Sequence, residues 1–180
     1  MLRRRRPPPD PLGHVDPAAV SPRFAGYVAD ALGARRRFAG LLAGVREGPV
    51  RDRLVEAGAR LDAGVHAVWE TARRAGEIEH TLAALDPERV AGDYKAARRT
   101  EGDDELEAVL AQRFASVQRL LNALDDTDER LRLLDARLGA TVAGAAEVAL
   151  GTTGADTLDS DLDGVVAELE SLRAALHELG

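Results

Sequence analysis

Apolar residues recur at alternating intervals of four and three along most of this chain. The longest run begins at Leu106 and ends at Val148, and it keeps this spacing throughout, although three of its positions are polar. Because an α-helix turns once every 3.6 residues, the spacing gathers these side chains on one stripe, and a sustained seven-residue repeat is typical of coiled coils. The run predicts a long helix over 105–150 that packs against other helices.

The same spacing predicts four further helices, separated by proline and glycine signals. Ser21-Pro22, Gly48-Pro49 and Asp86-Pro87 each place a proline in the first turn of a helix, where its missing N–H is not needed. A break follows at Gly151 to Gly154. The expected helices cover 22–47, 49–85, 87–99 and 156–179.

The length of the longest helix predicts the shape of the molecule. About 45 residues at 1.5 Å each extend roughly 68 Å, whereas a compact domain of this size is about 40 Å across. We therefore predict an all-α fold: an elongated antiparallel coiled-coil hairpin of helices 49–85 and 105–150, with the turn at 86–104 as its tip. The flanking helices would complete a four-helix base, so that residues 22–180 form one helical domain.

Residues 1–21 differ from the rest of the chain. They contain five prolines and no periodic apolar pattern, which predicts a disordered or extended tail. Arg3, Arg4, Arg5 and Arg6 in this tail suggest contact with an anionic surface. The rest of the chain is acidic, and no aromatic residues alternate with the arginines, so nucleic acid is not expected as a partner. A solubilising tail is the favoured interpretation, and contact with an acidic membrane surface is the weaker alternative.

The composition indicates the structural class of the protein and its expected cellular location. Aromatic residues make up 3% of the chain, as in a core of packed aliphatic helices, and cysteine is absent, which excludes disulfides and thiolate metal sites. No apolar run approaches the roughly 20 residues that span a bilayer. The N-terminus has no apolar signal region, so a cytoplasmic location is expected.

The net charge of −7 is spread unevenly. Residues 1–99 carry 18 basic and 13 acidic side chains, a net +5, whereas residues 100–180 carry 6 basic and 18 acidic, a net −12. The two halves could attract each other within one chain or across a dimer. The alternative is chance variation together with the arginine-rich tail.

One stretch matches the pattern of an EF-hand calcium loop. Asp159, Asp161 and Asp163 occupy loop positions 1, 3 and 5, Gly164 is at position 6, and Glu170 is at position 12. However, no helix enters the supposed loop, no second loop pairs with it, and an apolar heptad runs through it. We expect ordinary helix here and no metal, with calcium binding as the alternative.

A second candidate lies in the helix predicted over 49–85. Glu77-x-x-His80 resembles half of a di-iron motif of helical bundles, but the second Glu-x-x-His that such a site needs is absent. His66, Glu70 and Arg73 share its face, so a solvated charged stripe is the better interpretation. His14 and His177 have no nucleophile beside them in sequence. We expect no catalytic residues, no cofactor and no enzyme activity.

The stretch RFASVQRLLNALDDTDERLRLLDARLGA, residues 113–140, resembles a segment of uncharacterised all-helical coiled-coil proteins of actinobacteria. The resemblance extends over residues 12–179 and implies a helical fold but no known activity. The predicted hairpin is also similar in general shape to the phage-shock PspA type of membrane-stress protein, a likeness of fold alone.

These observations favour a non-enzymatic coiled-coil interaction or scaffold protein that binds a protein partner or associates with itself through its helices. A calcium-responsive helical bundle is the first alternative. A membrane-stress protein that docks through its arginine tail or an amphipathic helix is the second.

Overall fold

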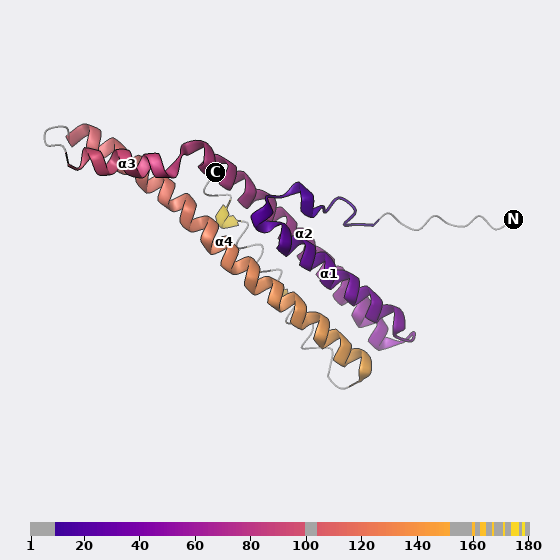
Figure 1. Cartoon of the computed structure of the whole chain (residues 1–180). Helices are drawn as coiled ribbons and strands as arrows, with labels where there is room; N and C mark the ends of the chain where they lie inside the picture. The colour runs from indigo at the N-terminus through magenta and orange to yellow at the C-terminus, as the bar shows by residue number, and fades with distance from the viewer. Residues whose placement is uncertain are drawn as a thin grey trace.

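The computed structural model describes residues 10–99, 104–151, 160, 163–164, 167, 171, 174–176 and 178. These ranges are helical and contain no strand, so the all-α class is confirmed. The molecule is elongated, and α4, with 47 residues, runs along most of its length (Figure 1). The elements in order are η1 (Pro17–Ala19), α1 (Pro22–Gly44), α2 (Pro49–Leu85), α3 (Pro87–Ala97) and α4 (Asp104–Leu150).

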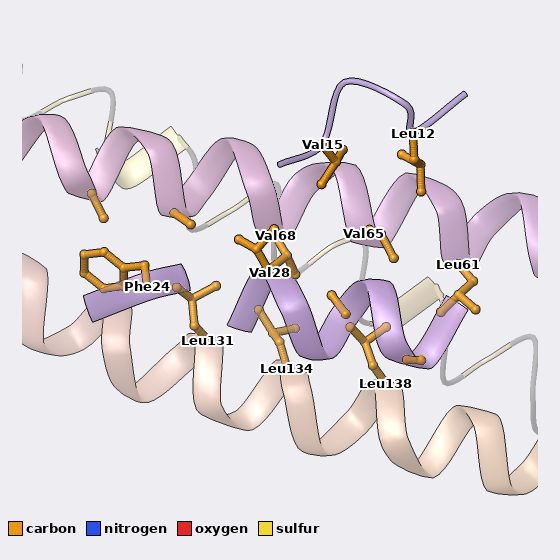
Figure 2. Packing of buried hydrophobic residues seen from close by; sticks show 14 of the residues in the cluster. Leu12, Val15, Phe24, Val28, Leu61, Val65, Val68, Leu131, Leu134 and Leu138 are labelled. Atoms are coloured by element: carbon orange, nitrogen blue, oxygen red, sulfur yellow. The ribbon is translucent and has the colours of Figure 1, made fainter. Parts of the chain in front are cut away.

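Three helices pack together at one end of the molecule. Arg23 pairs with Asp125 at 2.8 Å, and the Tyr27 hydroxyl donates to Asp128 at 3.0 Å, so α1 runs parallel to α4. Because α1 and α2 are joined by a short turn, α2 runs antiparallel to both. We call α1, residues 49–78 of α2 and residues 124–150 of α4 the base. Its core is aliphatic with two phenylalanines and includes Phe24, Val28, Phe38, Leu61, Val65, Val68, Leu131, Leu134 and Leu138 (Figure 2).

At the other end, α3 continues along α4 from the point where α2 stops. The rings of Tyr94 and Phe114 stack with centroids 5.1 Å apart, and Arg98 approaches Glu107 at 3.9 Å, so α3 is antiparallel to α4. Val90 is the buried residue of α3. We call α3 and residues 104–121 of α4 the arm (Figure 1).

The arm corrects the expected extent of the hairpin tip. The sequence predicted a short helix over 87–99 within a tip at 86–104, and this helix is present as α3, but α3 pairs with α4 and so lengthens the two-helix part. Asp86 makes this junction: its backbone adopts a left-handed conformation with φ 51°, and its side chain accepts a hydrogen bond from the N–H of Arg89. Asp tolerates this conformation better than most residues, so α2 can stop and α3 can start without a longer loop.

The helix bounds agree closely with the expected ones, except at the end of α1. The predicted helix 22–47 stops at Gly44, and its last carbonyls accept hydrogen bonds from the Arg51 guanidinium, at 2.8 Å from Leu42 and 3.1 Å from Val45. A cation on the next helix thus caps this C-terminus, as the helix dipole favours. Gly48, with φ 147°, then makes the turn into α2.

The expected tail over 1–21 is wrong for its second half. Leu12 and Val15 are buried against the base, and η1 is capped by Asp16, whose carboxylate accepts the N–H of Ala18 at 2.9 Å (Figure 2). Asp10 accepts two hydrogen bonds from Arg35. Two buried apolar residues are too few to give a periodic pattern in the sequence. Residues 1–9 lie outside the described residues.

The helix expected over 156–179 lies largely outside the described residues. Those that are described are helical, apart from a turn at residue 178. Leu176 is buried, and the Asp163 carboxylate lies 3.7 Å from the Arg60 guanidinium of α2. This part of the terminal segment therefore lies beside the base.

Candidate functional site

The apolar face of α4 is covered in the base but partly exposed near the start of α4, although Val117 is buried within the arm. Leu106 and Leu124 are 18 residues apart, which is five helical turns, so both lie on the same face of α4. Leu124 is 2% exposed, whereas Leu106 is 49% exposed. Val109 and Thr127 form a second such pair, with 59% and 0% exposure. The sequence predicted burial of Leu106, and that prediction is wrong.

The end of α1 explains the difference. This helix begins at Pro22 and meets α4 near Asp125, so it does not extend over the first five turns of α4. The face that α1 covers in the base continues into the arm as Leu106, Val109 and Arg113, all of which are exposed. The arm therefore presents two exposed apolar side chains, Leu106 and Val109, next to the exposed Arg113, and we call these three residues the arm stripe.

Aromatic and cationic side chains gather beside α3. An open hollow of about 540 Å³ is lined by Tyr94, Lys95, Arg98, Arg99 and Phe114. The Arg98 guanidinium lies 5.9 Å from the centre of the Tyr94 ring, within range of a cation–π contact. Both rings are half-buried because they pack on each other, and together they form the aromatic part of the lining of the hollow.

The two helices of the arm carry opposite charge. The basic residues near the end of α3 are Lys95, Arg98 and Arg99, and the first turn of α4 holds Asp104, Glu105 and Glu107. Each sign matches the helix end that it occupies, since cations favour a C-terminus and anions an N-terminus. The arm thus has a basic side and an acidic side next to an apolar stripe.

Only one of the four candidate calcium ligands lies within the described residues. Asp163 is helical and exposed, and its carboxylate faces the Arg60 guanidinium. Asp159, Asp161 and Glu170 lie outside the described residues. The expectation of no calcium site, and its alternative, both stay predictions.

The polar stripe of α2 is an ion-pair network. Arg73 bridges Glu70 at 3.4 Å and Glu77 at 2.7 Å, and Glu77 also accepts from Arg74 at 2.9 Å. His80 is exposed at its end. The Glu77 carboxylate is thus held by two guanidinium groups, and the described part of the chain contains no group of three side chains suited to a metal ion.

A cluster of rings that sequence reasoning missed lies where the N-terminal segment meets α2. His14 Nε2 and His66 Nδ1 are 3.1 Å apart, and the Trp69 ring lies 5.2 Å from the His14 ring. His14 was assigned to the tail and His66 to a solvated stripe. The two histidines are 52 residues apart, so no local spacing could have paired them.

The other predicted residues, Arg3 to Arg6 and His177, lie outside the described residues. Among the helices that the structure describes, none combines the length and the apolar character needed to cross a membrane.

No family model matches the chain, and no curated protein or solved structure matches it either. The resemblance of residues 113–140 to actinobacterial helical proteins therefore stays a prediction from the sequence.

Proposed function

We propose that this chain is a non-enzymatic interaction protein that associates with itself through the arm stripe. The observation that supports the proposal is the exposure of Leu106 and Val109 on the face of α4 that α1 buries five turns further along. Burial of apolar surface is the main driving force for protein association. A stripe of this kind on a two-helix arm is a favourable place for a partner helix to pack.

The charges of the arm favour a second copy as the partner. In a two-fold symmetric pair, each surface meets an identical surface in the opposite direction. With the two arms antiparallel, the basic end of α3 in one copy can face the acidic start of α4 in the other. The same residues, Arg99 and Asp104 among them, then contribute complementary charge from both copies.

The exposed groups of the arm suit contact rather than catalysis. Leu106 and Val109 supply apolar area, and Arg98 and Glu107 form a loose pair that can exchange partners. Ion pairs at the rim of an interface mainly determine orientation and association rate. This combination is typical of a helical interaction surface.

The proposal is tested by replacing Leu106 and Val109 together with Glu. Four carboxylates in a symmetric interface would be buried without partners, so association should weaken by at least a hundredfold. Sedimentation-velocity or light-scattering measurements over a range of concentrations give the dissociation constant. Association of the unmodified chain should also weaken as salt is raised.

Leu133→Glu is the matched control. Leu133 is on the same helix and is 45% exposed, but it lies in the base, away from the arm stripe. Its replacement should leave the dissociation constant unchanged. Self-association would be refuted if the unmodified chain stayed monomeric at about 100 µM. Only an interaction with a dissociation constant above that concentration would escape detection. Equal weakening by Leu133→Glu would place the interface elsewhere.

A further inference from the structure

The ring cluster at the N-terminal segment joins two parts of the chain by a single titratable contact. His14 lies in the segment before η1, and His66 and Trp69 lie one turn apart on α2. The two imidazole centres are 5.1 Å apart and nearly edge to face, with Trp69 packed against both rings. The indole N–H is buried and has no acceptor among the described residues. Its packing therefore depends on the two imidazoles staying in place.

A hydrogen bond between two imidazoles requires one N–H and one lone pair. His14 Nε2 and His66 Nδ1 at 3.1 Å meet this condition when one ring is neutral at its bonding nitrogen. One added proton can be shared as a charged donor and a neutral acceptor, so it strengthens the contact. A second proton leaves two N–H groups and two positive charges facing each other, and the bond is lost.

We propose that His14 and His66 form a pH-sensitive latch that holds residues 12–20 on α2 and releases them when both imidazoles are protonated. Two imidazolium rings at this separation repel each other and have no lone pair with which to make the hydrogen bond. The latch is therefore closed while at most one ring is charged, and it opens in acid, when both rings are charged.

Charged groups on α2 lie one turn from His66 on either side. Asp62 pairs with Arg35 at 2.7 Å, and Glu70 pairs with Arg73 at 3.4 Å. Each carboxylate is therefore shared with a guanidinium and offers only part of its charge to an imidazolium.

The charged groups of the segment and of α1 act separately from the latch. Asp10 accepts hydrogen bonds from Arg35 at 2.7 and 3.0 Å, and these bonds lower the pKa of its carboxyl from 3.8. Asp16 caps η1. Because Asp10 stays ionised at pH 5, its pair with Arg35 keeps the start of the segment attached while the histidine contact opens.

Release would uncover apolar surface on both sides of the contact. Leu12 and Val15 flank His14 in sequence, are buried and lie over the part of α2 that carries Val65 (Figure 2). Opening exposes these side chains together with Trp69. Protonation would thus convert a covered edge of the base into an open apolar edge, independently of the arm.

Hydrogen–deuterium exchange with mass spectrometry tests the latch on the full chain. The amides of Gly13, Val15 and Ala19 are hydrogen-bonded within the segment. After correction for the intrinsic pH dependence of exchange, their protection should fall between pH 7 and pH 5. Protection in α4 should not change.

The matched variants are His66→Gln and His80→Gln, both on α2. Gln does not titrate, so His66→Gln should abolish the pH dependence of segment protection, whatever its absolute level. His80 is exposed and lies outside the cluster, so His80→Gln should keep the full response. Unchanged protection of the unmodified chain from pH 7 to pH 5 would refute the latch, and so would an undiminished response in His66→Gln.

Discussion

The base and the arm share the same long helix, but they use its apolar stripe differently. In the base, where α1 and α2 pack on α4, Leu124 and Thr127 are buried. In the arm, Leu106 and Val109 occupy the same face five turns earlier and are exposed. The residues are of similar kind and the helical pattern is continuous. Only the number of neighbouring helices changes between the two regions.

This comparison shows what a heptad pattern does and does not report. The pattern states which face of a helix is apolar, because side chains at positions i, i+3, i+4 and i+7 share that face. It does not state whether a neighbour covers that face within the same chain. The uncovered stretch is therefore where we look for function, whereas the covered stretch supplies stability.

The largest expected effect separates the two regions directly. Leu131→Ala removes a fully buried side chain from the base, so the free energy of unfolding should fall by about 2–5 kcal/mol through lost transfer energy and a residual cavity. Leu106→Ala, measured in the same urea titration at low protein concentration, should change it by no more than about 0.5 kcal/mol. Similar losses for both variants would show that the arm stripe is buried.

A smaller and more local effect is expected in the arm. Val90 is the buried side chain of α3, and Val90→Ala removes two methyl groups, worth about 1.6 kcal/mol at 0.8 kcal/mol each. Since few contacts hold α3, the loss should appear as faster amide exchange in 87–97, with exchange in the base unchanged. Loss of protection throughout α1 would mean that arm and base unfold as one unit.

Replacing two exposed glycines tests the same distinction between base and arm by substitutions that should stabilise rather than destabilise a helix. Gly139 of α4 and Gly92 of α3 lie within helices, and an added Cβ would meet nothing within 4 Å at either site. Gly139→Ala should raise the free energy of global unfolding by about 1 kcal/mol. Gly92→Ala should raise the free energy of local opening of α3, measured by amide exchange, by a comparable amount. The midpoint of urea unfolding should not change. A shift of the midpoint by Gly92→Ala would contradict the separation.

The smallest expected effect is the pH dependence of stability that arises from the Asp10–Arg35 pair at the edge of the base. Hydrogen bonds from Arg35 and the Leu12 N–H lower the pKa of Asp10 below 3.8. A carboxyl with a lowered folded-state pKa stabilises the folded state above 3.8, and this contribution is lost as pH falls through the folded value. The carboxyl ¹³C shift of Asp10 should titrate below pH 3.8. Titration at or above this value would show that the Arg35 pair does not form in solution.

Much of the fold followed from particular residues in the sequence. Pro49 and Leu85 bound α2 as predicted, because a proline fits the first helical turn and Asp86-Pro87 starts the next helix. The end of α1 was misplaced by three residues because the capping cation, Arg51, comes from the following helix. The extent of the hairpin tip was misplaced because the packing of Tyr94 on Phe114 is a tertiary contact.

The candidate sites were less predictable than the helices. The histidine cluster was missed because His14 has no periodic neighbours, and its contact with His66 forms only after α2 and the N-terminal segment fold together. The arm stripe was read as part of a buried seam. Its exposure depends on where α1 stops, and a one-dimensional pattern of α4 contains no information about that.

The sequence by itself determined the all-α class, the bounds of α2 and the apolar face of every long helix. These properties follow from local physics: side-chain periodicity, proline and glycine conformations, and helix capping. Only the tertiary structure decided which apolar stretches are covered, how far the arm extends and that His14 meets His66. Coverage and long-range pairing depend on where other helices begin and end, so the same leucine pattern is a core at Leu124 and a surface at Leu106.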